Sequence, residues 1–239
     1  MIGKYDVIDN DQDAWEQYPH HRWLFNKLEV ALKAGYAAGP ACSRVPFQKD
    51  TKVIVRPIYN LFGMGVGAKI HYLSTKNNKA LLRNEIVPPG YFWCEYFEGK
   101  HYSIDFKSSK SPKGSIFRWE PFHAMVAQYD ENNLYRFSSW KSIDPPKITF
   151  PLPHFLNHIT DIKYINVEFK DDKLFEIHLR TGNDILHSWP TGSWAFPVWN
   201  DKPELINSPA FVPNFSDDIE LYKSAGTNYH RLGFLVRKP

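Results

Sequence analysis

The sequence predicts an α+β fold in which antiparallel strands predominate and helices are few. Short runs of β-branched and aromatic residues alternate with turn residues, and two of these runs are joined by the turn 170–173, Lys-Asp-Asp-Lys. Only one run, 23–35, has clear helical spacing, with Leu24, Leu28, Ala31 and Leu32 on one face. No repeat and no Pro/Ser/Gly linker separates independent domains. We therefore expect two closely connected lobes.

Length, charge and cysteine content limit the classes of function. The 239 residues suffice for one large domain or two small lobes, and the formal net charge is +3 without a block of like charges. Cys42 and Cys94 have no metal-ligand spacing. No apolar run approaches the ~20 residues of a membrane helix, and the first residues lack the features of a signal peptide. We expect a cytoplasmic protein with neither a membrane nor a nucleic-acid partner.

The elements are predicted in chain order as follows. Residues 1–20 are polar and are expected to be irregular, and the helix of 23–35 ends at Gly35. Residues 107–115 are expected to form a polar loop, and 116–153 to form strands with long connections. Further strands are expected at 53–55, 69–75, on both sides of a turn at 98–100, at 163–169, at 174–179 and at 232–237.

The stretch Val53–Ala68 has the features of a phosphate-binding strand and loop. Three β-branched residues, Val53 to Val55, predict a buried strand. Arg56 follows, and then glycines alternate at Gly63, Gly65 and Gly67. Glycines permit positive φ and let backbone N–H groups approach a ligand. The pattern indicates a polyphosphate site, and a set of tight turns is the alternative.

Two glutamates in the 163–179 hairpin form a candidate metal site. Glu168 and Glu176 lie on adjacent strands, and their side chains are expected on the same face. Two facing carboxylates repel each other unless a cation lies between them. His178 points to the same face because it is two residues after Glu176. A solvated hairpin pair and a simple strand histidine are the alternatives.

Three stretches, in this order, resemble motifs of the ATP-grasp family of nucleotide-dependent ligases. They are IVRP with GMGVGA, WCEYFEGKHYSIDF, and VEFKDDKLFEIHLRTGN. The family has a hydrophobic-Lys-Pro strand before a glycine-rich loop, then Glu-x-x-x-x-Gly-x-Glu, then paired acidic residues ending in Glu-x-Asn-x-Arg. The upstream FNKLEVALKAGYAAGPA is similar to the family's Asn-Lys helix. The resemblance covers 26–183, about two thirds of the chain.

The resemblance implies a nucleotide-binding role for several residues. Lys27 is implied as the first phosphate-contacting cation, although a lysine on the polar face of a helix is more commonly solvated. Arg56 occupies the position of the family's phosphate-binding lysine, and Gly63, Gly65 and Gly67 form a flap over the phosphates. The adenine hinge is implied at Trp93, Cys94 and Tyr96. The carboxylate for the ribose hydroxyls is implied at Glu95, the family's hinge carboxylate, or at Glu98 beside it.

The resemblance also implies metal ligands and a catalytic cation. Glu168 and Glu176 would hold Mg²⁺ or Mn²⁺, and His178 occupies the position of the family's Asn. An imidazole suits softer ions than Mg²⁺. Arg180 would neutralise the transferred phosphoryl group or the tetrahedral oxyanion. ATP and Mg²⁺ (or Mn²⁺) are therefore the expected cofactors.

The implied fold has two lobes with nucleotide between two antiparallel sheets, and a reduced or absent preceding α/β domain. We divide the chain into a lead-in and helix at 1–50, a nucleotide-binding lobe at 51–110 and a second lobe at 111–239. The implied activity joins a carboxylate to an amine or other nucleophile through an acyl phosphate. The acceptor is a small molecule or a peptide, recognised by this chain, a partner chain or a second copy. A catalytically degenerate nucleotide-binding module and a non-nucleotide binding protein are the alternatives.

Overall fold

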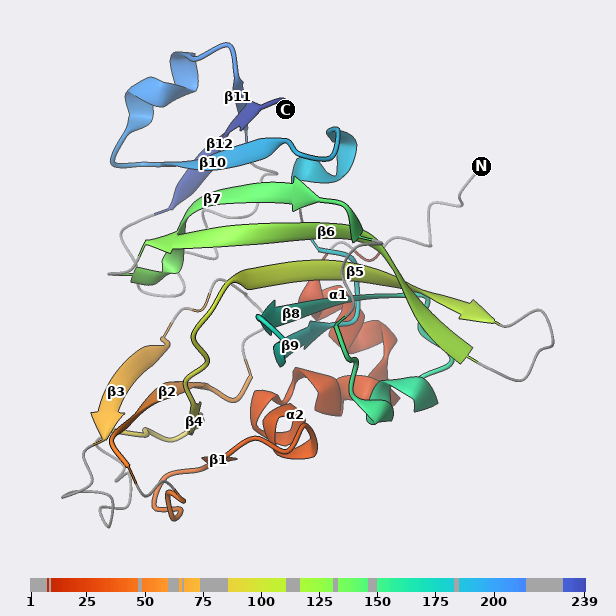
Figure 1. Cartoon of the computed structure of the whole chain (residues 1–239), viewed down its shortest axis with the longest axis vertical. Coiled ribbons are helices and arrows are strands. Elements are labelled where there is room, and N and C mark those ends of the chain that lie inside the picture. Colours follow the sequence, from red (N-terminus) through yellow and green to blue (C-terminus); the bar gives the residue numbers. More distant parts are fainter. Residues whose placement is uncertain are drawn as a thin grey trace.

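Two antiparallel sheets make up most of the structure, a computed structural model. The helices formed by residues 11–33 lie where the two sheets approach each other (Figure 1). The structure describes residues 8, 10–46, 49–59, 65, 67–73, 86–110, 117–130, 133–145, 150–182, 185–213 and 230–239. Among the helices in these ranges, none is long and apolar enough to span a membrane.

In the part of the chain that the structure describes, the smaller sheet has four strands. Their spatial order is β1 (Ala38–Gly39), β4 (Tyr91–Glu95), β2 (Thr51–Pro57) and β3 (Lys69–Leu73). The β-branched run lies in β2, as predicted. Its odd-numbered residues Val53 and Val55 are buried against Trp93, because successive strand side chains point to opposite faces. Arg56 therefore lies on the other face of the sheet.

The larger sheet has eight strands among the described residues. Their spatial order is β11 (Phe211–Pro213), β12 (Arg231–Arg237), β10 (Trp194–Trp199), β7 (Asn133–Ile143), β6 (Phe117–Asp130), β5 (His101–Lys110), β8 (Tyr164–Lys170) and β9 (Lys173–His178). The predicted hairpin at 163–179 is the β8–β9 pair, with its turn at Asp171 and Asp172. The last predicted strand is β12.

The two faces of β5, β8 and β9 differ in polarity. One face contributes Ile104, Val167 and Ile177 to the main hydrophobic core. The helical segments that pack against this core are α1 (Asp11–Gln17), η1 (Pro19–Phe25), α2 (Lys27–Lys33) and η3 (His154–His158). The opposite face carries a row of polar residues: His101, Ser103, Asp105, Asn166, Glu168, Glu176 and His178. The candidate sites lie on this polar face.

Several predicted boundaries were wrong at the N-terminal end. Residues 11–17 form α1 rather than an irregular lead-in, because the side chain of Asn10 caps the helix by accepting from the N–H of Asp13. The helix predicted for 23–35 is divided, with a 3₁₀ segment ending at Phe25 and α2 beginning at Lys27. Asn26 separates the two segments by capping α2.

Two further corrections concern the large sheet. β5 continues to Lys110, so the first part of the predicted polar loop 107–115 belongs to a strand. The connection between β6 and β7 spans only 131–132 instead of a long loop. β5 pairs with β6 and β8 in the larger sheet, and the division of the chain into lobes at 51–110 and 111–239 stays a prediction.

Candidate functional site

The two hairpin glutamates face each other across β8 and β9. Glu168 is directly opposite Glu176 in the strand register, on the polar face of the sheet. Their side chains are 22% and 12% exposed. Burial alone would raise the pKa of Glu168, but the positive charge and hydrogen bond of His101 outweigh it and hold this pKa well below its usual value. Both carboxylates are thus positioned as one anionic pair.

Three basic side chains surround this pair, and two of them come from other elements. Lys27 of α2 places its Nζ 2.7 Å from Glu176 Oε1, and His101 of β5 places its Nε2 3.0 Å from Glu168 Oε2. His178 Nε2 lies 3.6 Å from Glu168 Oε1 and 3.5 Å from Glu176 Oε1. Lys27 is therefore buried in the site and not solvated. The protein itself supplies basic groups that relieve the repulsion between the two glutamates.

A second ion pair lies behind His178. Asp11 of α1 is buried, with Oδ2 2.9 Å from His178 Nδ1 and Oδ1 2.8 Å from Arg180 Nε. Burial favours neutral forms, but the mutual charges outweigh it. The pKa of Asp11 is lowered to about 2, and that of His178 is raised to about 10. His178 is therefore protonated at neutral pH, and Arg180 is directed at Asp11.

Arg56 connects the smaller sheet to the hairpin. Its Nη2 donates to the carbonyl oxygen of Phe175, 2.9 Å away, immediately before Glu176. The guanidinium carbon lies 5.3 Å from the ring centre of Phe92 and 5.7 Å from that of Phe175. Its buried Nε has no hydrogen-bond partner in the part of the chain that the structure describes. An anion at this position would satisfy that donor.

His101 and Tyr129 form a buried polar pair that the sequence reasoning missed. The His101 ring is enclosed by aromatic rings at centroid distances of 5.1–5.5 Å, and its Nδ1 is hydrogen-bonded to the Tyr129 hydroxyl. Burial, followed by the charges of Glu168 and Glu176, raises the pKa of Tyr129 well above its usual value. Its hydroxyl therefore stays protonated at neutral pH.

Two of the three glycines of the predicted phosphate loop, Gly65 and Gly67, are among the described residues. Gly63 is outside the described residues. Gly65 and Gly67 have φ of +60° and +82°, a region that favours glycine. A Cβ on Gly65 would lie 3.4 Å from the carbonyl oxygen of Leu134 in β7, and one on Gly67 would lie 2.7 Å from the Tyr91 hydroxyl. Gly67 therefore lies beside the smaller sheet, and Gly65 lies beside a strand of the larger one.

Three of the five proposed hinge residues have side chains engaged within the smaller sheet. Trp93 is buried and donates its Nε1–H to Ser43 Oγ at 2.7 Å. Cys94 is buried, and burial raises the pKa of its thiol to about 11. Glu95 Oε1 accepts from the N–H of Ala37 at 3.0 Å. Any contact of these residues with a nucleotide would therefore involve their backbone groups.

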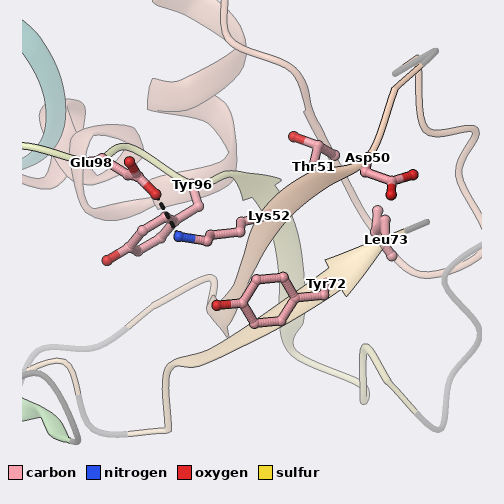
Figure 2. Close-up of a pocket in the computed structure, with 7 residues that line it drawn as sticks. All are labelled: Asp50, Thr51, Lys52, Tyr72, Leu73, Tyr96 and Glu98. Atoms are coloured by element: carbon pink, nitrogen blue, oxygen red, sulfur yellow. Dashed lines mark hydrogen bonds and ion pairs between the residues drawn. The ribbon is translucent and has the colours of Figure 1, made fainter. Parts of the chain in front are cut away.

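The other two hinge residues, Tyr96 and Glu98, line a pocket of about 610 Å³ at the edge of the smaller sheet (Figure 2). Figure 2 shows Lys52 between the rings of Tyr72 and Tyr96. Its Nζ lies 5.6 Å and 5.8 Å from the two ring centres and 2.5 Å from Glu98 Oε1. The remaining lining residues are Asp50, Thr51 and Leu73. The pocket offers two aromatic faces, one cation and two carboxylates.

Some of the missed residues had a signal in the sequence. His101 is two residues after Gly99, where the Gly-x-Glu pattern of the resemblance would have a glutamate. Asp11 follows Asn10, a preferred N-cap residue, in an acidic stretch that is typical of a helix start. Lys52 and Tyr72 are directly opposite on β2 and β3, but no motif distinguished them.

Comparisons with known proteins give a fold and no sequence family. No protein-family model matches the sequence, and no curated protein matches it. A carboxyaminoimidazole ribonucleotide synthase from Aspergillus clavatus, complexed with ATP, has a TM-score of 0.53 at 11% identity over 96% of this chain and 74% of its own. The N5-carboxyaminoimidazole synthetase of Staphylococcus aureus has a TM-score of 0.51 at 12% identity over 89% of this chain, which spans 66% of its length.

A third solved structure is the N5-carboxyaminoimidazole ribonucleotide synthetase of Thermus thermophilus, with a TM-score of 0.50 at 9% identity over 99% of this chain and 76% of its own. These likenesses, together with the two antiparallel sheets, show that the chain has the ATP-grasp fold. The fold expected from the motifs is confirmed. All three of these solved structures are carboxyaminoimidazole-forming synthetases, at identities that show the fold alone.

Proposed function

We propose that this chain binds ATP between its two sheets and acts as an ATP-dependent ligase that joins a carboxylate to an amine or another nucleophile. The observation that carries the proposal is the meeting of Arg56, from the smaller sheet, with the Glu168–Glu176 hairpin of the larger sheet. The fold supports it, and one structure that shares the fold is complexed with ATP.

The nucleotide would be held mainly by charge and by backbone groups. Arg56 has a buried Nε–H without a partner among the described residues, which fits a phosphate oxygen. Gly65 and Gly67 would let loop N–H groups approach the phosphates. Lys27 would exchange Glu176 for a phosphate. We assign the base and ribose to the pocket of Tyr96 and Glu98, where two tyrosine rings offer stacking surfaces.

Glu168 and Glu176 fit a hard divalent ion because they supply two facing carboxylates. A bound Mg²⁺ or Mn²⁺ would neutralise charge on the phosphoryl oxygens. His178 is proposed as a further ligand, but its pKa of about 10 means that a proton competes for the imidazole at neutral pH. Until it loses that proton, His178 acts as a counter-ion to the two glutamates.

The proposed reaction has two steps. A substrate carboxylate oxygen attacks the γ-phosphorus, the bond to the β-phosphate oxygen breaks, and ADP leaves. The amine then attacks the acyl carbon, the bond to the phosphate oxygen breaks, and inorganic phosphate leaves with one proton passing to solvent. Arg56 and Arg180 would stabilise the negative charge that develops on the reacting oxygens. Small-molecule carboxylates and amines, or a peptide acceptor, are the proposed substrates.

Thermal unfolding with Mg-ATP or Mn-ATP tests the nucleotide site. Ligand at 100 times its Kd should add about 2.7 kcal/mol to the free energy of unfolding of the wild type. Glu176→Gln should weaken this stabilisation, whereas Glu204→Gln on the exposed η5 segment (Pro203–Asn207) is the matched control. Release of phosphate with pairs of carboxylates and amines tests the ligase activity. No stabilisation at millimolar nucleotide with either metal would refute the proposal.

A catalytically degenerate nucleotide-binding module is the second candidate function. The specific observation in its favour is that three basic side chains, Lys27, His101 and His178, already contact the glutamate pair. Such a module would be stabilised by nucleotide without added divalent metal, and would release no phosphate with any substrate pair. Metal-dependent stabilisation together with phosphate release would exclude it.

A further inference from the structure

A second polar cluster lies on the same face of the large sheet, away from the two glutamates. It consists of Asp105 on β5, His123 on β6 and His187 on η4 (Ile185–Ser188). One ligand atom from each lies within 4.8 Å of the others. His187 Nε2 is 3.0 Å from Asp105 Oδ2, and the two imidazole rings stack with centroids 4.0 Å apart. Two imidazoles and a carboxylate thus converge on one point.

The strand pairing explains why these residues meet. Asp105 and His123 are directly opposite in the β5–β6 register, so their side chains share a face. The register shifts immediately afterwards, where Phe106 pairs with Pro121. Such a β-bulge redirects side chains and is common beside functional sites. Proline is accommodated at a bulge because it cannot donate a ladder hydrogen bond.

The Asp105 carboxylate is oriented by the groups around it. Its Oδ1 accepts from the backbone N–H of Gly182 at 2.7 Å and from Asn166 Nδ2 at 2.8 Å. Oδ2 is thereby directed at His187. Asp105 is 1% exposed and His187 is 30% exposed. A buried, hydrogen-bonded carboxylate beside a partly exposed imidazole is the arrangement in which metal ligands are fixed by surrounding groups.

We propose that Asp105, His123 and His187 bind one Zn²⁺ and leave a fourth coordination position open to solvent. Imidazole nitrogen with carboxylate oxygen suits zinc and disfavours Mg²⁺. Ligand atoms in a tetrahedral zinc site lie about 3.3 Å apart, given bonds of roughly 2.0 Å. The 3.0 Å between His187 Nε2 and Asp105 Oδ2 is close to that separation. Three protein ligands with an open position are typical of zinc that exchanges an external ligand.

The site would also fix the chain segment that follows β9. Gly182, which donates to Asp105, is two residues after Arg180, and His187 lies on the next short helix. Zinc would attach that helix to β5 and β6 and so restrain the segment containing Arg180. The zinc ligands are distinct from Glu168, Glu176 and His178, so this proposal does not depend on the proposed function.

Zinc titration of tag-free, chelator-treated protein without nucleotide tests the site. A chromophoric zinc indicator measures affinity and stoichiometry, and the visible absorption of added Co²⁺ reports the ligand set. One equivalent should bind to the wild type. His187→Ala and His123→Ala should each lower the affinity by on the order of 100-fold, because each removes one of three ligands. His187 is partly exposed, so its replacement is expected to leave the fold intact, as circular dichroism would verify.

Two controls separate this site from other metal-binding groups. His154→Ala removes one member of the exposed His154–His158 pair on η3, whose ring centroids are 5.1 Å apart, and should leave zinc affinity unchanged. Glu176→Gln, which tests the proposed function, should also leave it unchanged. Absence of zinc binding at micromolar metal would overturn the proposal. Binding that survives both His123→Ala and His187→Ala, or that is lost in Glu176→Gln alone, would overturn it as well.

Discussion

The protonated His178 should make the protein less stable in mild alkali. Its pKa is about 10 in the folded protein and 6.5 as its ordinary value. A raised pKa stabilises the fold fully below pH 6.5, and this stabilisation is lost as pH rises through 10. From the folded and ordinary pKa values, protonation of His178 contributes about 4 kcal/mol to the free energy of unfolding at pH 7. At pH 9 the contribution is between about 1 and 2 kcal/mol. The contribution should therefore fall by roughly 2–3 kcal/mol.

The comparison of wild type with His178→Asn isolates this term. Other groups also titrate in this range, since burial lowers the pKa of Lys170 to about 8, but they are common to both proteins. Urea unfolding at pH 7 and pH 9 gives four free energies of unfolding. The difference in free energy of unfolding between the wild type and the variant should be roughly 2–3 kcal/mol smaller at pH 9 than at pH 7. An advantage that is equal at both pH values would refute the ion-pair assignment of His178.

Three further perturbations test other parts of the site. Lys27→Met leaves Glu176 without its 2.7 Å partner and should lower the free energy of unfolding, measured with urea, by on the order of 3 kcal/mol. The control Lys33→Met, on the exposed side of α2, should change it by less than about 0.5 kcal/mol. Equal losses in the two variants would contradict the difference in burial between the two lysines. The pKa of Asp11 is lowered from 3.8 to about 2. Its ionised form should therefore add about 2 kcal/mol to the free energy of unfolding above pH 4, and this contribution should disappear as pH falls to 2. Acid unfolding of Asp11→Asn should not show this loss of stability. In Gly67→Ala the new Cβ would be on a residue with positive φ and would lie 2.7 Å from the Tyr91 hydroxyl. The substitution should lower the free energy of unfolding by at least about 1–2 kcal/mol. An unchanged free energy of unfolding would show that Gly67 is not held in this conformation.

The expected losses of stability in acid and in alkali both arise from one ion pair, between Asp11 and His178. The lowered pKa of Asp11 and the raised pKa of His178 both arise largely from their contact at 2.9 Å. Their free energies are therefore not additive. Between about pH 4 and pH 9 both groups are charged, and this is the range in which α1 should be most firmly attached.

Local patterns in the sequence were enough to predict the hairpin and its register. Alternating apolar residues on both sides of Lys-Asp-Asp-Lys fix which face each strand buries, and so they place Glu168 opposite Glu176. The β-branched run of β2 was similarly informative. The ordered motifs predicted the fold, because together they specify a strand, a loop and a hairpin of one known arrangement.

Contacts between distant segments could not be predicted from the sequence. Lys27 is one of several charged residues on a short amphipathic helix, and only the packing of α2 against β9 brings it to Glu176. Asp11 lies in a stretch whose composition indicates solvent exposure, yet it is buried beside His178 and Arg180. The cluster of Asp105, His123 and His187 combines three elements with no shared motif. Local propensity carries no information on such tertiary pairings.

The contacts of the β8–β9 hairpin have a consequence for how the chain folds during synthesis. Asp11 meets His178 across a sequence separation of 167 residues, and Arg56 meets Phe175 across 119. The N-terminal helix and the smaller sheet are therefore translated long before the strand that attaches them to the larger sheet. Long-range closures of this kind slow folding. Asp11, Lys27 and Arg56 therefore stay hydrated until β9 has left the ribosome, because their partners lie on or next to that strand.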